Sequence, residues 1–287
     1  MRRIFVFVFF LCFLHQLSAV VVVKRLYINR GVFTTVKNTT FPFLAFNSDT
    51  SFNQLNEVIH LNVNDTLSLV IINNDIFLHG FAIKGTSVSN LGIATGDSAA
   101  FQLTSSIHRA FIYYDPYFYP VYRSLGLAGM IYCGLPGNHA VYYWNIKEHQ
   151  TSFAQVLASG GSVNFNNYQP DYYTINSKSF PDLQIDSTAK IHAHVGDTVY
   201  IVVANTGQSM HSLHFHGFHP RSIHSDSKIL QAGWEKDTWG MFSMDCMVLR
   251  MIPDKPGRYS VHDHNLVAIS GGNTHPNGMF TIMEIAP

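Results

Sequence analysis

Apolar and polar positions alternate along most of the chain, and this alternation predicts β-strands. Leu67, Leu69 and Ile71 alternate with their neighbours, as in a sandwich strand with one buried face. Short runs of the same kind, separated by turn residues, occur at 58–63, 77–83, 99–103, 110–114 and 127–132. No long segment carries a sustained helical period. The pattern therefore predicts an all-β protein.

The strand pattern occurs twice. Residues 63–74 and 195–206, about 132 positions apart, share a strand–turn–strand order, an Asp-Thr pair and a closing Asn. Each copy then runs into a His-Gly pair, His79-Gly80 in the first and His216-Gly217 in the second. Only two copies exist, so the repeat indicates a duplicated β-domain and not a solenoid. We expect the first domain at 20–150 and the second at 151–287.

The first 19 residues have the composition of a signal peptide. Arg2 and Arg3 precede an apolar run from Ile4 to Leu14, and small residues follow up to Ala19. The run is shorter than the ~20 apolar residues that cross a membrane. We expect export to the periplasm or the outside of the cell, with a retained N-terminal anchor as the alternative. No later stretch has the length of a membrane span.

Composition narrows the function classes. The chain has 18 Lys+Arg and 18 Asp+Glu, so no basic excess points to a nucleic-acid partner. Without the signal peptide the cysteines are Cys133 and Cys246, which allow one disulfide and exclude a disulfide scaffold. No Ser-His-Asp motif and no phosphate-binding glycine loop is present. The 16 histidines instead raise a metal hypothesis.

Half of the histidines lie between residues 211 and 275. Four of these histidines form two His-X-His pairs, His214 with His216 and His262 with His264. Residues i and i+2 of a strand point to the same face, so two such strands can bring four imidazoles together. That set suits copper or zinc. The alternative is a solvated, histidine-rich face.

These segments resemble motifs of the multicopper oxidases. His211-x-x-His214-x-His216-Gly217 resembles their HxxHxHG motif, and His262-Asp263-His264 stands where they carry His-Cys-His. Gly278-Met279 resembles the Gly-Met that follows, and 171–181 resembles a segment that opens a later domain. The resemblance implies two tandem cupredoxin-like Greek-key β-sandwiches, the second of the C-terminal multicopper oxidase type. It also implies the two-domain branch of small laccases and copper nitrite reductases, which are homotrimers with copper between subunits.

The resemblance also implies a ligand set. His214 matches a type 2 copper ligand, and His216, His262 and His264 match type 3 ligands. His211 matches a type 1 ligand. A neighbouring subunit would supply His79, and His275 lies further from His264 than the corresponding family residue. The predicted metal ligands are His79, His211, His214, His216, His262, His264 and His275, with the two His-X-His pairs at their centre. His192 and His194 match no ligand and are expected on an exposed strand face.

The chain departs from the family at two places. Asp263 replaces the cysteine, and a carboxylate does not make a blue copper centre. In the first domain only His79 matches, and Tyr114-Asp115 stands in the second motif. We therefore predict a copper-dependent oxidoreductase with a histidine site between subunits and no type 1 copper. The alternatives are a non-catalytic, exported copper-binding or sequestering protein and a structural trimer with decayed sites. The substrate and the electron donor are not specified by the sequence.

Overall fold

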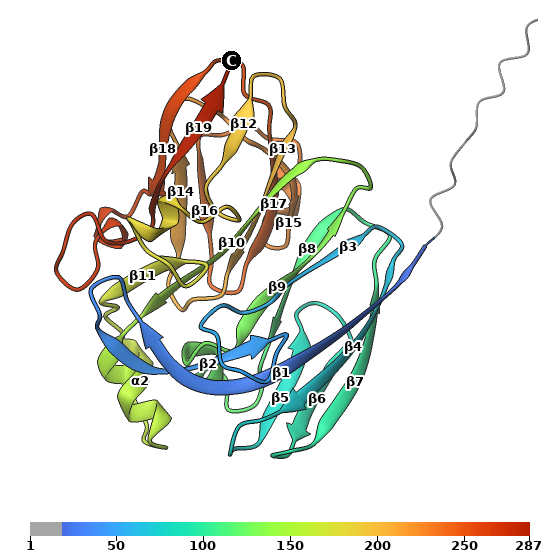
Figure 1. Cartoon of the computed structure of the whole chain (residues 1–287), viewed down its shortest axis with the longest axis vertical. Helices are drawn as coiled ribbons and strands as arrows, with labels where there is room; N and C mark the ends of the chain where they lie inside the picture. Colours follow the sequence, from blue (N-terminus) through green and yellow to red (C-terminus); the bar gives the residue numbers. More distant parts are fainter. Residues whose placement is uncertain (1–18) are drawn as a thin grey trace, which may run out of the picture.

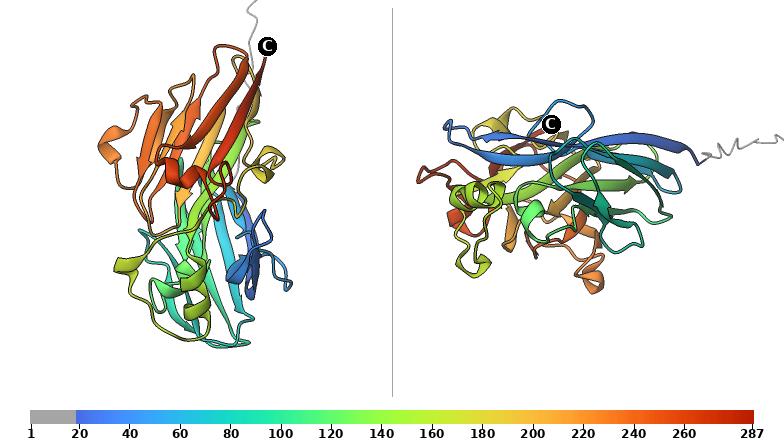
Figure 2. Two further views of the ribbon diagram at one scale, coloured as in Figure 1. Left: turned by 90° about the vertical axis from the view of Figure 1, so that its left-hand side faces the viewer. Right: turned by 90° about the horizontal axis from the view of Figure 1, so that it is seen from below.

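The computed structural model describes residues 19–287, which form two stacked β-sandwiches. The predicted signal peptide, apart from Ala19, lies outside these residues. Figure 1 shows the blue-to-green half of the chain below the yellow-to-red half, and the left view of Figure 2 shows the two halves stacked along the long axis. The predicted all-β, two-sandwich fold is confirmed.

The first sandwich contains a four-stranded and a five-stranded sheet. The order in the first sheet is β2 (Thr40–Asn47), β1 (Val21–Thr34), β4 (Thr66–Asn73) and β7 (Ser98–Thr104). The order in the second is β3 (Val58–Asn62), β9 (Ala128–Gly134), β8 (Arg109–Tyr114), β5 (His79–Ile83) and β6 (Ser89–Ile93).

The second sandwich contains two five-stranded sheets. The order in one is β11 (Tyr172–Ile175), β10 (Ala140–His149), β13 (Val199–Asn205), β17 (Cys246–Met251) and β15 (Arg221–Ser225). The order in the other is β12 (His192–His194), β19 (Phe280–Ala286), β18 (Gly257–Asp263), β14 (His211–Phe215) and β16 (Thr238–Met241).

Strand β10 belongs to the second sandwich by its hydrogen bonds. It pairs in parallel with β13, just as β1 pairs in parallel with β4 in the first sandwich. The boundary expected between residues 150 and 151 therefore falls after a strand that the hydrogen bonding assigns to the second sandwich. Sheet pairing puts the join ahead of Ala140.

Helices are short. They are α1 (Val121–Ser124), α2 (Thr151–Ala158) and the 3-10 turns Phe165–Asn167, Asp182–Gln184, Ile229–Gln231 and Leu266–Ile269. Helix α2 packs against β2 at the lower left of Figure 1. Over residues 19–287, none of the helices has the length and apolarity to cross a membrane.

A third apolar cluster joins the two sandwich cores. Ile112 of β8 and Met130 of β9 pack in one cluster with Val202 of β13 and Val248 of β17. Two sheets, one from each sandwich, therefore bury each other. Cys246 lies in this cluster, Cys133 lies in the first core, and both are free thiols, so the disulfide that the sequence allowed is not formed.

Strand pairing fixes the correspondence between the two halves. His214 lies opposite His262 across β14 and β18, and Ala82 lies opposite Tyr114 across β5 and β8. This makes His79 the counterpart of His211, because both begin their strands. Matching His79-Gly80 with His216-Gly217 was wrong. The counterpart of His216-Gly217 is Lys84-Gly85, five residues further along, where both glycines have positive φ (75° and 78°).

Candidate metal centre

Four histidines gather at the ends of β14 and β18. His214 and His262 face each other in the antiparallel pair, and His216 and His264 follow at the strand ends. The ring centroid of His214 lies 4.6 Å from that of His216, 5.6 Å from that of His262 and 5.5 Å from that of His264. His216 and His264 are exposed, and His214 and His262 are half-buried. The two predicted His-X-His pairs thus share one surface.

Hydrogen bonds orient two of these rings. His262 donates its Nδ1–H to the backbone oxygen of Asp263 at 2.9 Å, which leaves the lone pair on Nε2. Nε2 of His216 lies 3.0 Å from that atom. Nδ1 of His214 is 2.8 Å from the hydroxyl of Thr238. Ligand histidines in metalloproteins are commonly held in this way through their second nitrogen.

The four histidines do not form a preformed metal site, although two of their nitrogens lie close enough to share an ion. Two Nε2 atoms at 3.0 Å can both bind one ion at the usual ~2.0–2.1 Å distance. Among residues 19–287, no group of three or more His, Cys, Asp or Glu side chains has the geometry of a metal site. Burial, with the nearby rings of His214 and His262, lowers the pKa of His216, which favours the neutral imidazole that metals bind.

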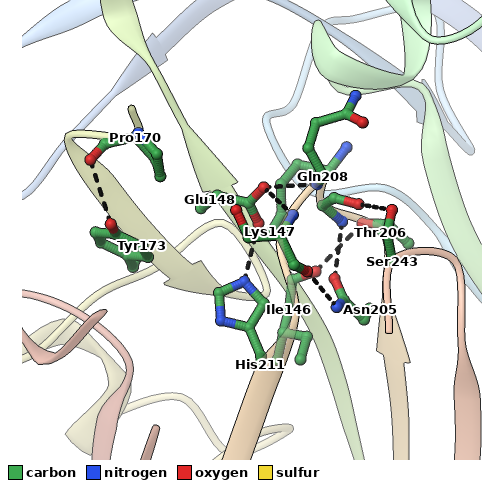
Figure 3. A network of polar contacts seen from close by, with 12 residues as sticks. Ile146, Lys147, Glu148, Pro170, Tyr173, Asn205, Thr206, Gln208, His211 and Ser243 are labelled. Carbon is green, nitrogen blue, oxygen red and sulfur yellow. Dashed lines mark hydrogen bonds and ion pairs between the residues drawn. The ribbon is translucent and has the colours of Figure 1, made fainter. Parts of the chain in front are cut away.

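His211 has a different environment. It is buried in β14, donates Nδ1–H to Oδ2 of Asp263 at 2.5 Å and donates Nε2–H to Oε2 of Glu148 at 2.9 Å. Figure 3 shows the contact with Glu148. Two carboxylate acceptors require both nitrogens to carry hydrogen, so the ring is an imidazolium. Burial alone would lower its pKa, but the bonds to Asp263 and Glu148 outweigh burial and raise the pKa to about 9.

His79 is enclosed in the same way in the first domain. It donates Nδ1–H to Oδ2 of Asp115 at 2.6 Å and Nε2–H to Oδ2 of Asp75 at 2.7 Å. Arg30 donates to both oxygens of Asp75, at 2.6 and 2.7 Å. Neither His79 nor His211 has a ring nitrogen free for a metal in this structure. We therefore do not retain either residue as a proposed ligand.

The aspartates that bond His79 and His211 make the same backbone hydrogen bonds in the two domains. Oδ1 of Asp115 accepts the backbone N–H of Gly80 at 2.9 Å and of Tyr117 at 2.8 Å. Oδ1 of Asp263 accepts the backbone N–H of Ser212 at 3.2 Å and of Asn265 at 2.9 Å. In both domains the aspartate bonds the residue after the histidine and the residue two places after itself. Asp263, which stands at the family's cysteine position, is thus part of a repeated motif.

The outer carboxylate comes from a different place in each domain. In the second it is Glu148 of β10. In the first, β1 carries Arg30 at the equivalent position, and the loop after β4 supplies Asp75. The loop position beside Glu148 is Gly207, and a Cβ there would overlap the carboxylate. Glu148 also accepts the backbone N–H groups of Gln208 at 2.5 Å and Ser209 at 2.8 Å. Sequence spacing did not reveal Glu148, which lies 63 residues before His211.

The remaining candidates lie apart from the histidine cluster. His275 is exposed, with Nδ1 3.5 Å from the hydroxyl of Ser270. Asp115 is fully buried against His79, and Tyr114 packs against Tyr119. The first-domain counterparts of the four clustered histidines are Ala82, Lys84, Tyr114 and Pro116.

His192 and His194 lie on the exposed strand β12, as expected. Nδ1 of His192 is 3.4 Å from Glu284, and Nδ1 of His194 is 3.6 Å from Asp197. They form an exposed His-X-His pair outside the four-histidine cluster.

Comparisons with known proteins agree with the two-sandwich fold and with the resemblance of the second half of the chain to the multicopper oxidases. Residues 159–276 match the multicopper oxidase family. No curated protein matches the chain in sequence. A blue copper oxidase from Nitrosomonas europaea superposes with a TM-score of 0.78 at 20% identity, over 93% of this chain and 86% of that one. The multicopper oxidase mgLAC gives 0.77 at 20% identity, over 93% and 86%.

A copper nitrite reductase from Nitrosomonas europaea has a TM-score of 0.72 at 16% identity, over 92% of this chain and 94% of that one. The likeness to these structures covers both sandwiches, whereas the family match lies within the second half of the chain. Residues 159–276 are thus similar to the multicopper oxidase family, and the whole chain has the two-domain cupredoxin fold of these structures.

Proposed function

We propose that this protein is an exported copper-dependent oxidoreductase whose metal site consists of His214, His216, His262 and His264. The observation that carries the proposal is the meeting of these rings at one edge of the multicopper oxidase domain, with two Nε2 atoms 3.0 Å apart. Imidazole suits copper, and the Nδ1–H of His262 already has an acceptor.

The chemistry that copper would supply here is one-electron exchange between Cu(II) and Cu(I). The protein's part is to hold the four imidazoles and to leave the exposed side of the cluster open to a small molecule. Among residues 19–287 the two cysteines lie in apolar cores, and Asp263, in place of the family's cysteine, is engaged with His211. Electrons would therefore enter at the histidine site itself, without a blue copper relay.

The proposal needs no imidazole from a second subunit. The first domain carries Ala82, Lys84, Tyr114 and Pro116 at the positions equivalent to the cluster, and His79 is enclosed. All four proposed ligands then come from one chain. A homotrimer remains a prediction from the family resemblance, and in it the neighbouring subunit would add no metal ligand.

A non-catalytic copper-binding protein is the second candidate. One observation favours it: His211 and Asp263, which stand at the positions of the family's type 1 ligands, are engaged in a buried ion cluster. A protein with this arrangement can hold copper without a second metal to exchange electrons with. A structural trimer with decayed sites is the third candidate, and metal binding distinguishes it from the other two.

Metal content and electron paramagnetic resonance of the purified protein test the proposal. We expect bound copper, a spectrum without an intense blue thiolate band, and loss of the copper in His214→Ala and His264→Ala. His192→Ala and His194→Ala are matched controls, since they remove exposed imidazoles of another His-X-His pair. Metal-free protein that refuses added Cu(II) would rule out the first two candidates. Oxygen uptake or nitrite reduction with artificial donors then separates an enzyme from a binder.

A further inference from the structure

The buried cluster of Glu148, His211 and Asp263 is separate from the proposed ligands but touches the backbone that carries them. All three side chains are at most 2% exposed. Oδ1 of Asp263 accepts the N–H of Ser212, which lies in β14, and the N–H of Asn265, which follows His264. A single carboxylate thus ties the start of one ligand strand to the end of the other.

The backbone of Asp263 adds two further constraints. Its oxygen accepts the Nδ1–H of His262, and its N–H donates to the oxygen of Met279 at 3.2 Å. The next residue, His264, donates its N–H to the oxygen of Ser212 at 2.6 Å. Residues 262–264 are therefore fixed on both sides, although His264 itself is exposed.

The first domain provides an internal comparison. Asp115, His79 and Asp75 form the corresponding cluster with the same backbone bonds, but the flanking residues Tyr114 and Pro116 are not ligands. The cluster can thus form without a neighbouring metal site. In the second domain the same support carries histidines on both sides of its aspartate.

We propose that Asp263, held by His211 and Glu148, is a positioning residue that sets the geometry of His262 and His264 for the metal. The inference rests on the proposed copper site, and it assigns a task to a residue at the position of the lost cysteine. Asp263 does not touch the metal in this account. It acts through the backbone of its two neighbours.

Three variants of the full-length protein test the proposal by Cu(II) titration and electron paramagnetic resonance. Asp263→Ala removes the acceptor for Ser212 and Asn265, so we expect Cu(II) affinity to fall at least tenfold and the hyperfine splitting to change. Asp263→Asn keeps an oxygen for those N–H groups and an amide that can donate to a neutral His211, so affinity should return to within about threefold of the original. Asp115→Ala removes the same kind of bonds from the first domain and should leave the copper spectrum unchanged.

Two results would overturn the inference. One is a folded Asp263→Ala protein with unaltered affinity and spectrum, and the other is an equal loss in Asp115→Ala, which would indicate a general effect of instability. If the unaltered protein binds no copper, the proposed function fails separately. Nitrogen-15 NMR of the metal-free protein then still decides the positioning: His262 must carry its proton on Nδ1 and His211 must carry two at pH 7.5. A His262 ring protonated on Nε2 alone would overturn it, including where Asp263→Ala does not fold.

Discussion

At the scale of single residues, the fate of His211 illustrates what sequence spacing can and cannot specify. The motif HxxHxHG correctly grouped His214 with His216, because positions two apart on a strand share a face. It could not specify what surrounds His211, because Glu148 approaches from a strand far away in the sequence. A carboxylate on each ring nitrogen turns a predicted metal ligand into a buried cation.

This buried cation should make stability depend on pH. The pKa of His211 is raised to about 9, above the ~6.5 of an unfolded chain. Its stabilising contribution is therefore complete below about pH 6.5 and declines as pH rises through 9. The 6.5-to-9 difference corresponds to about 3 kcal/mol.

Urea unfolding of the unaltered protein and of His211→Gln at pH 6, 7.5 and 9.5 measures this contribution. The excess stability of the unaltered protein should shrink at the highest pH, since Glu148, Asp263 and the nearby Tyr173 are common to both proteins. A difference that stays constant across the three pH values would contradict a protonated His211.

At the scale of strands, the sequence predicted several elements of each half but not the pairing of β10 across the expected boundary. Alternation identified 99–103, 110–114 and 127–132 close to the observed β7, β8 and β9. It did not predict that Ala140–His149 joins the second sandwich, because a parallel partner lies far along the chain and leaves no local signal. The same limit caused the five-residue error in matching His79, which only cross-strand pairing corrected.

Hydrogen exchange should show to which sandwich β10 belongs. In His211→Gln, the lost ion cluster weakens the second sandwich, so peptides covering 141–149 and 199–205 should exchange faster, whereas 66–73 should keep its protection. His79→Gln is the matched control, and it should reverse the pattern. If 141–149 instead follows 66–73 in both variants, β10 is energetically part of the first sandwich.

At the scale of the whole molecule, helix α1 connects the two ion clusters. The ring of Tyr122 lies 4.3 Å from that of His79. The next residue, Arg123, donates to the backbone oxygens of Thr206 and Gly207, beside Glu148. Two consecutive residues thus contact one cluster in each domain, and the buried interface of the two sheets adds to this link.

Replacing this arginine should destabilise the molecule strongly. Arg123 is 2% exposed and also donates to the hydroxyl of Ser243 at 2.9 Å, so Arg123→Met removes several buried hydrogen bonds and takes the arginine donor from the buried oxygen of Thr206. A buried acceptor that loses its donor costs about 1–3 kcal/mol. Thermal and urea unfolding measure the loss. Lys24→Met is the control, because its pair with Glu57 is partly exposed and such pairs contribute about 1 kcal/mol or less. Equal effects of the two substitutions would show that Arg123 does not link the domains.

The glycine beside Glu148 limits which residues of one half of this chain can be exchanged for those of the other. In the first half a strand arginine meets a loop aspartate, and in the second a strand glutamate meets Gly207. An aspartate in place of Gly207 would overlap Glu148 and put two acids on one side of His211. An arginine in place of Glu148 would leave that side of the ring without an acid. Each strand residue therefore fits the loop residue of its own half, so the two halves are not interchangeable parts.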